Sequence, residues 1–333
     1  MKGIFAVERG KLGILDIPIP EPGPYEVLLK SVACSICNST DTKLLHGQFF
    51  SGTFPVLLGH ESVGRVVKLG EKVRTYKPGD LVLRGALTDA HVPLPGGRSC
   101  WGGFAEYNLA VDVWARDNLD YAAFAHPQQI VPDWIDPLQA AALITLKENL
   151  SVISNMDVKG KSLVIIGTGP VAQSMTLFAR LLGASFIAVA GRQERWHDRF
   201  IQLGADAYFT GQNYPPAVQE ILRDGGFDRA AEAVGDRNAL KHAIALVGNK
   251  GKVGLYGVAP ENEPYLQSDL EQPVVFSPKV AEAEVHTQIL EMIRDGKINL
   301  SDWISHTLPW QDYQLGFEMV WRKEANKVVL VYG

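Results

Sequence analysis

The sequence is poor in cysteine, which excludes one large class of small secreted proteins. It has three cysteines, Cys34, Cys37 and Cys100, among 333 residues. Three cysteines are too few for a framework of disulfide bonds, so we expect a reducing, cytoplasmic location.

Long apolar runs and an excess of positive charge are also lacking. The apolar stretch at residues 140–146 is far shorter than the roughly 20 residues that cross a bilayer. The first residues reach Glu8 and Arg9 too early for the apolar core of a secretory signal. The net charge is −5, whereas proteins that bind nucleic acid usually carry a basic face. We therefore expect neither a membrane nor a nucleic-acid partner.

What the chain does contain is a change of pattern near Asp136. Residues 1–110 combine glycine and proline with short apolar runs at 26–33, 62–69, 80–83 and 104–109, which predicts an irregular β domain. Asp136 and Pro137 predict the start of a helix over 137–154. Strands at 162–166, 186–190, 227–233 and 252–257 then alternate with helices at 170–182, 194–203 and 237–247, and this alternation predicts a parallel sheet covered on both faces. A helix over 286–294 and a strand over 327–332 follow.

The first of these strands leads into a glycine pattern. Residues 163–172 read LVIIGTGPVA, which fits G-x-G-x-x-A between a strand and a helix. Gly167 permits the tight turn, Gly169 lets the backbone approach a pyrophosphate, and Ala172 lets the helix pack closely on the strand. Pro170 and Val171 open the helix, whose free N–H groups favour phosphate. The pattern predicts a dinucleotide-binding Rossmann fold.

The end of the second strand indicates which dinucleotide is bound. An acidic residue at this place would bind the ribose 2′-hydroxyl of NAD, but Gly191 stands here and Arg192 follows. We expect glycine to leave room for a 2′-phosphate, and the guanidinium to pair with it, with help from Arg195. The alternative is a surface arginine, and the interpretation we prefer is NADP(H) over NAD(H).

Cys37, His60 and Glu61 are the candidate metal ligands. They lie in the segments Ala-Cys-Ser-Ile-Cys at 33–37 and Leu-Gly-His-Glu at 58–61. Thiolate, imidazole and carboxylate groups suit zinc. A C-x-x-C pair by itself can equally be redox-active, a structural zinc site or fortuitous, and His60 by itself can be an ordinary polar or core histidine.

Together these motifs resemble the zinc-containing branch of the medium-chain dehydrogenase/reductase superfamily, the alcohol, sorbitol and threonine dehydrogenases. Further matches at 78–80, 102–107, 232–235 and 295–298 read Pro-Gly-Asp, Gly-Gly-Phe-Ala-Glu-Tyr, Glu-Ala-Val-Gly and Asp-Gly-Lys-Ile. The resemblance implies an α/β protein: a β-rich GroES-like catalytic domain at 1–146 and 280–333, and a doubly wound Rossmann domain at 147–279. It implies one catalytic zinc held by Cys37 and His60, a proton-relay hydroxyl, and a homodimer or homotetramer in which the strand near 252–257 and the segment after it pair across a two-fold axis.

The sequence departs from this family at four places. The spacing after Cys37 is one residue longer, so either Thr40 or Ser39 can be the relay hydroxyl. Lys43 replaces the usual distal histidine of the relay, or is a surface lysine. The loop at 83–103 offers only Cys100, so we expect no structural zinc. The third ligand of the catalytic metal should fall at residues 144–146, which are Ile, Thr and Leu, so that Glu61 or Glu148 would have to take this place.

These motifs lead to a functional hypothesis. We expect a zinc-dependent oxidoreductase that interconverts a secondary alcohol, polyol or sugar-derived alcohol with its carbonyl compound. The alternatives are a zinc-free enone or quinone reductase and a non-catalytic NADP(H) sensor. Phe49, Phe50 and Trp101 are candidates to line an apolar substrate pocket, or else belong to the core.

Overall fold

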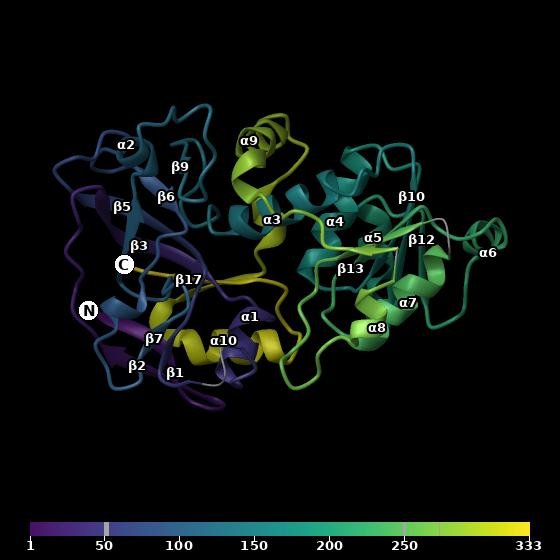
Figure 1. Ribbon diagram of the computed structural model, residues 1–333, viewed down its shortest axis with the longest axis horizontal. Helices are drawn as coiled ribbons and strands as arrows, with labels where there is room; N and C mark the ends of the chain where they lie inside the picture. Colours follow the sequence, from purple (N-terminus) through teal and green to yellow (C-terminus); the bar gives the residue numbers. More distant parts are fainter. Residues whose placement is uncertain (50–52, 249–250, 273) are drawn as a thin grey trace. The chain divides into compact units, whose positions relative to one another are not determined.

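The structure is a computed structural model that describes residues 1–49, 53–248, 251–272 and 274–333, so Phe50 lies outside the described residues. The described chain divides into two compact units, residues 1–145 with 286–333, and residues 146–285 (Figure 1). No helix in the described ranges is long and apolar enough to cross a membrane.

The first unit is built on two sheets. One has the strand order β16-β17-β3-β5-β6-β9, with β8 also paired to β3, and the other has the order β2-β1-β4-β7. The strands are β1 (Lys2–Glu8), β2 (Lys11–Asp16), β3 (Glu26–Ser35), β4 (Val56–Leu57), β5 (Glu61–Leu69), β6 (Leu81–Leu83), β7 (Arg98–Ser99), β8 (Tyr107–Val111), β9 (Ile130–Val131), β16 (His306–Pro309) and β17 (Val328–Val331). The helices are α1 (Thr40–Leu45), α2 (Val113–Asp117), α9 (His286–Arg294) and α10 (Tyr313–Trp321).

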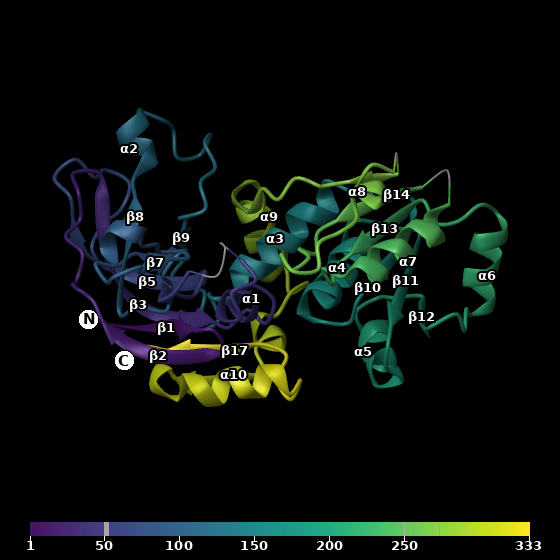
Figure 2. The ribbon, with the colours of Figure 1, turned by 60° about the horizontal axis from the view of Figure 1, so that its bottom comes forward.

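The last strand of the chain lies inside this unit rather than at its margin. β17 pairs antiparallel with β3 and parallel with β16, and α10 packs along β17 (Figure 2). Val328 and Leu330 of β17 are fully buried in one apolar cluster with Phe317 of α10. Residues 1–145 and the C-terminal residues 286–333 therefore share one core.

The second unit is a parallel sheet with the strand order β12-β11-β10-β13-β14-β15. Its strands are β10 (Ser162–Ile166), β11 (Phe186–Gly191), β12 (Ala207–Thr210), β13 (Arg229–Glu232), β14 (Lys252–Leu255) and β15 (Val275–Phe276). Its helices are α4 (Pro170–Leu181), α5 (His197–Gln202), α6 (Pro216–Arg223), α7 (Arg237–Val247) and α8 (Gln267–Leu270), and α3 (Ala142–Ser154) spans the boundary between the units.

Both faces of this sheet are buried, as a parallel sheet requires. Val164 and Ile166 of β10 pack in one cluster with Leu240 of α7, and the alternate residues Leu163 and Ile165 are equally buried on the other face. α7 is capped by Asp236, whose carboxylate accepts hydrogen bonds from the backbone N–H groups of residues 238 and 239. The expectation of a parallel, doubly covered sheet is confirmed.

The start expected for the helix over 137–154 is wrong, and the strand expected near 252–257 is shorter than expected. The helix expected from residue 137 begins at Ala142, because Asp136 caps a separate turn and accepts from the N–H groups of Leu138 and Gln139. The strand near 252–257 is β14, which is paired on both sides, by β13 and β15. Within the described residues β15 is therefore the edge strand on this side of the sheet.

Candidate functional site

The candidate metal site lies where three neighbouring strands meet. β3 runs antiparallel to both β5 and β17, so that the end of β3 lies beside the starts of the other two. The register pairs Ser35 with Glu61 on one side and with Val329 on the other. Cys37 follows β3, His60 precedes β5 and Lys327 precedes β17, and the topology therefore gathers these residues at one edge.

Gly59 sets the path of the chain into His60. Its φ is +93°, and a Cβ atom there would lie 2.5 Å from the backbone nitrogen of Phe104. Only glycine satisfies both constraints, which gives the Gly-His-Glu pattern a structural reason.

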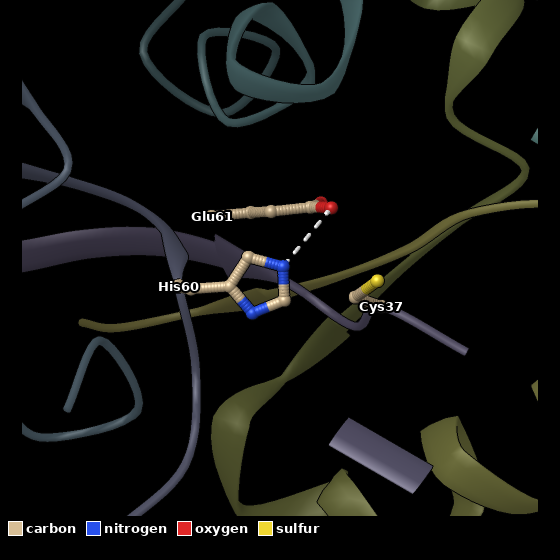
Figure 3. A group of neighbouring side chains, drawn as sticks. All are labelled: Cys37, His60 and Glu61. Atoms are coloured by element: carbon tan, nitrogen blue, oxygen red, sulfur yellow. Dashed lines mark ion pairs between the residues drawn. The ribbon is translucent and has the colours of Figure 1, made fainter. Parts of the chain in front are cut away.

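The structure brings the three predicted metal ligands together. The Cys37 sulfur, a ring nitrogen of His60 and a carboxylate oxygen of Glu61 all lie within 4.8 Å of one another. Figure 3 shows the His60 nitrogen that faces Glu61, with the Cys37 sulfur on the same side of the ring. Among the described residues this is the one group of three or more such side chains close enough to hold a metal ion.

Each His60 nitrogen faces a different carboxylate. Nε2 lies 3.8 Å from Glu61 Oε1, and Nδ1 lies 3.7 Å from Asp41 Oδ1. Both His60 Nδ1 and Asp41 Oδ1 are buried and make no hydrogen bond in the described structure. Burial disfavours the imidazolium, but the Cys37 sulfur and Asp41 raise the pKa of His60 well above its usual range. The site therefore attracts positive charge.

Glu61 is held by three side chains that the sequence analysis did not select as a group. Its Oε2 accepts from Ser35 and from Lys327 Nζ at 2.5 Å, and its Oε1 accepts from Thr145 Oγ1 at 2.7 Å. Lys327 also donates to Thr145 over 3.0 Å. Burial opposes ionisation, but the ammonium group of Lys327 lowers the pKa of Glu61 to about 2. Lys327 carries no sequence signal because its partner is 266 residues away.

The other positions considered for the third ligand are residues 144–146 and Glu148. Ile144 and Leu146 are buried apolar side chains, and Thr145 uses its hydroxyl to bind Glu61. Glu148 belongs to the second unit, where it accepts a hydrogen bond from Tyr256 over 3.2 Å.

The candidate relay residues lie on α1 or, in the case of Ser39, directly before it. Asp41 is buried in this helix and accepts from the backbone N–H of Cys37 over 2.9 Å. Lys43 Nζ donates to Ser39 Oγ over 2.9 Å and lies 5.4 Å from the centre of the Phe49 ring. Thr40 is the first residue of α1. The structure thus pairs Lys43 with Ser39 rather than with Thr40.

Of the aromatic side chains suggested for a substrate pocket, Trp101 lies near the site. Its ring centre is 5.2 Å from that of His60, and 38% of the residue is exposed. Hydrogen bonds and an ion pair hold the loop at 83–103: Asp89 accepts from the Ser99 N–H over 2.8 Å and lies 3.3 Å from Arg98.

The glycine pattern of the second unit forms a strand–turn–helix. Gly167 has φ +130°, Gly169 caps α4, and Pro170 is its first residue. A Cβ at Gly167 would lie 3.7 Å from that of Ala172, which shows how closely the turn and the helix pack. Val171, next to Pro170, lies in the first turn.

Arg192 and Arg195, which follow β11, are exposed. Arg192 follows Gly191 directly, and Arg195 lies over the ring of Trp196 at 5.2 Å. Arg199, which the sequence analysis did not select, reaches from α5 to Gln173 of α4 over 3.4 Å.

Comparison with known families identifies both units. Residues 23–115 match the alcohol dehydrogenase GroES-like domain, and residues 170–282 match the zinc-binding dehydrogenase domain. Together the two matches cover more than half of the chain.

Individual relatives cover nearly the whole chain. An uncharacterized zinc-type alcohol dehydrogenase-like protein of Escherichia coli K12 is 28% identical, over 93% of this chain and 92% of its own. L-threonine 3-dehydrogenase of Anaeromyxobacter sp. strain K is 26% identical, over 96% and 94%.

Comparison with solved structures leads to the same family. The alcohol dehydrogenase of Thermus sp. ATN1 superposes with a TM-score of 0.79 and 25% identity, over 99% of each chain. A protein of Sinorhizobium meliloti 1021 assigned to the zinc-binding dehydrogenases and solved with NADP gives 0.75 and 26%, over 99% of each. The chain is therefore a member of the zinc-containing medium-chain dehydrogenase/reductase superfamily, an oxidoreductase of the zinc-type alcohol dehydrogenase kind.

Proposed function

We propose that the chain interconverts a secondary alcohol, polyol or sugar-derived alcohol with its carbonyl compound, using one zinc ion and preferring NADP(H). The observation that carries this proposal is the convergence of Cys37, His60 and Glu61, with ligand atoms within 4.8 Å of one another. L-threonine, the substrate named for several relatives, is itself a secondary alcohol, and we include it in the substrate class.

The donor set fits zinc. Sulfur, imidazole nitrogen and carboxylate oxygen are its common protein ligands, and three of them with one open position are typical of a catalytic site. Zinc–ligand bonds of about 2.0–2.3 Å place ligand atoms about 3.6 Å apart in a tetrahedron. The ligand atoms of Cys37, His60 and Glu61 therefore need to approach one another only slightly to bind zinc. Asp41 beside Nδ1 provides the second partner that orients a ligating histidine.

Glu61 is the third ligand in this proposal. Of its two carboxylate oxygens, Oε2 is committed to Lys327 and Ser35, whereas Oε1 faces His60 Nε2. Thr145 stands in the region expected for the third ligand and holds Glu61 instead. A metal bound by Glu148, or only by Cys37, His60 and water, would contradict this assignment.

The residues around the site position the reacting groups and guide protons. A zinc ion held by Cys37, His60 and Glu61 would supply a Lewis acid for the substrate oxygen, and a bound nicotinamide cofactor would supply hydride chemistry. Ser39, held by Lys43, is then favoured over Thr40 as the hydroxyl that passes the alcohol proton towards solvent. Lys327 keeps Glu61 ionised and in place.

The preference for NADP(H) rests on the second unit. Residue 191, where an acid would bind the NAD ribose, is glycine, and the exposed guanidinium of Arg192 follows it. A 2′-phosphate would gain a charge-assisted contact there. The relative from Sinorhizobium meliloti, which was solved with NADP, is consistent with this preference.

Zinc analysis and kinetics test the proposal together. Protein purified without chelators should contain one zinc per chain and reduce or oxidise members of an alcohol panel with NADP(H). Protein that contains no zinc and reduces enones or quinones would instead be a zinc-free reductase of the same superfamily. Light scattering in solution tests the homodimer or homotetramer that we expect.

A further inference from the structure

The space beside Gly191 is filled, not open. A Cβ atom at this glycine would lie 1.9 Å from Tyr208 Oη, 2.6 Å from Tyr208 Cζ and 2.8 Å from Thr168 Cγ2. Distances this short exclude any side chain unless a neighbour moves. The room that the sequence analysis expected next to Gly191 is thus occupied by a phenol.

Tyr208 is fixed where it stands. It lies in β12 opposite Val189 of β11, and it is 5% exposed. Its hydroxyl donates to the backbone carbonyl of Gln193 over 2.6 Å. Its ring stacks on Phe200 with centres 5.8 Å apart and planes 21° apart. Because the hydroxyl is bonded to Gln193 and the ring is stacked on Phe200, the Tyr208 side chain cannot shift easily to make room for a side chain at residue 191.

The blocked position is the one that matters for the cofactor. In a Rossmann fold an acidic side chain at the end of the second strand binds the ribose 2′-hydroxyl and would repel a 2′-phosphate. Here the nearest acidic side chain along the chain is Glu194, whose carboxylate accepts from Thr210 Oγ1 over 2.5 Å. Tyr208 therefore brings an uncharged group to the place of a carboxylate.

We propose that Tyr208 is a specificity-determining residue: its phenol excludes an acidic side chain from residue 191, and its hydrogen bond to Gln193 holds the turn that carries Arg192. This inference builds on the NADP(H) preference proposed above. It adds that Tyr208 of β12 prevents an acidic side chain at residue 191, so that changing residue 191 alone cannot reverse the preference for NADP(H).

A double-mutant cycle tests this lock. The variants are Gly191→Asp, Tyr208→Val and the two combined, compared with the unchanged protein. The readouts are the apparent melting temperature without cofactor, and dissociation constants for 2′,5′-ADP and 5′-AMP by calorimetry. These fragments differ only in the 2′-phosphate, and their binding needs neither zinc nor turnover.

We expect Gly191→Asp alone to melt well below the unchanged protein, and to cost much less in the Tyr208→Val background. The combined variant should then lose at least about tenfold of the preference for 2′,5′-ADP that Tyr208→Val shows, because a carboxylate replaces the phosphate contact. Equal losses in both backgrounds, or a folded Gly191→Asp variant that already prefers 5′-AMP, would overturn the proposal.

Two further variants separate bulk from charge and from hydrogen bonding. Gly191→Ala adds a Cβ without charge, so it should repeat the stability pattern of the cycle even if Gly191→Asp does not fold. Tyr208→Phe keeps the ring but loses the bond to Gln193, and it should weaken 2′,5′-ADP about two- to tenfold while changing 5′-AMP less. Equal weakening of both fragments would reduce Tyr208 to a structural role.

The outcome also distinguishes this inference from the proposal on which it rests. An unchanged protein that binds 5′-AMP as tightly as 2′,5′-ADP would reject the NADP(H) preference. The melting temperatures of the cycle would still decide whether Tyr208 excludes a side chain at residue 191.

Discussion

Removing the ammonium group of Lys327 should destabilise the first unit strongly. Lys327 Nζ lies 2.5 Å from Glu61 Oε2, and both side chains are almost fully buried. In Lys327→Met the carboxylate of Glu61 keeps its bonds from Ser35 and Thr145 but loses the ammonium group that lowers its pKa most. Burial then dominates, and the pKa of Glu61 should rise from about 2.

The expected cost follows from breaking a buried ion pair at one partner, about 3–5 kcal/mol. At about 2–4 °C per kcal/mol for a unit of this size, the apparent Tm should fall by roughly 6–20 °C. The measurement is thermal and urea unfolding of chelator-treated protein. Because zinc brings a positive charge to the same carboxylate, adding zinc should raise the Tm of Lys327→Met more than that of the unchanged protein.

Two companion variants make the reasoning refutable. Glu61→Gln combined with Lys327→Met removes both charges and should recover much of the lost stability. Lys11→Met removes an exposed ion pair with Glu8 and should change the Tm little. If Lys327→Met in the metal-free protein melts like Lys11→Met, the buried pair contributes nothing and our account of Glu61 is wrong.

Three other results are expected. Cys37→Ser should lose zinc by elemental analysis and most of its turnover, yet bind NADP(H) with unchanged affinity; retained zinc would remove Cys37 from the ligand set. Arg192→Ala should reduce the preference of kcat/KM for NADP(H) over NAD(H) by about tenfold or more, chiefly through KM for NADP(H), and full retention of the preference would place the phosphate elsewhere. Asp112→Ala should lower the free energy of unfolding by about 2–4 kcal/mol at pH 7, because the buried carboxylate accepts from the N–H groups of Arg74, Thr75 and Ala115. Burial opposes ionisation of Asp112, yet these bonds lower its pKa. Its contribution to the free energy of unfolding is therefore present above its unfolded pKa of about 3.9 and is lost as the pH falls through the folded pKa. An Asp112→Ala variant as acid-sensitive as the unchanged protein would contradict this.

Much of the fold follows from local patterns in the sequence. The strand at 162–166 and the helix at 237–247 have the boundaries expected, because a continuous apolar run and a capped amphipathic segment signal themselves within a few residues. β12 gives no such signal, since Ala-Tyr-Phe-Thr is only four residues long and shows no alternation. Because the sequence does not predict β12, it does not predict that Tyr208 lies beside Gly191. The contact with Tyr208 is the reason why residue 191 is glycine.

The candidate site is predictable only in part. The Cys37 and His60 motifs stand out by residue type, and it is their resemblance, together with the other matches, to the zinc-containing dehydrogenases that indicates zinc. Lys327 directly precedes β17 and Thr145 lies on α3, and they reach Glu61 across 266 and 84 residues of sequence, which no local pattern records. The electrostatics of the site therefore require the structure.

The placement of β17 has a consequence for biosynthesis. Residues 146–285 form one continuous stretch, and we expect them to fold as soon as they have left the ribosome. β3 cannot pair with β17, its neighbour in the sheet, until residues 328–331 have been translated. Lys327 arrives in the same final step, and a nascent chain that meets zinc earlier does so with Cys37, His60 and an uncompensated Glu61 already exposed. We therefore expect the ion pair that holds Glu61, and with it the final arrangement of the candidate metal site, to form only after residue 327 has been translated.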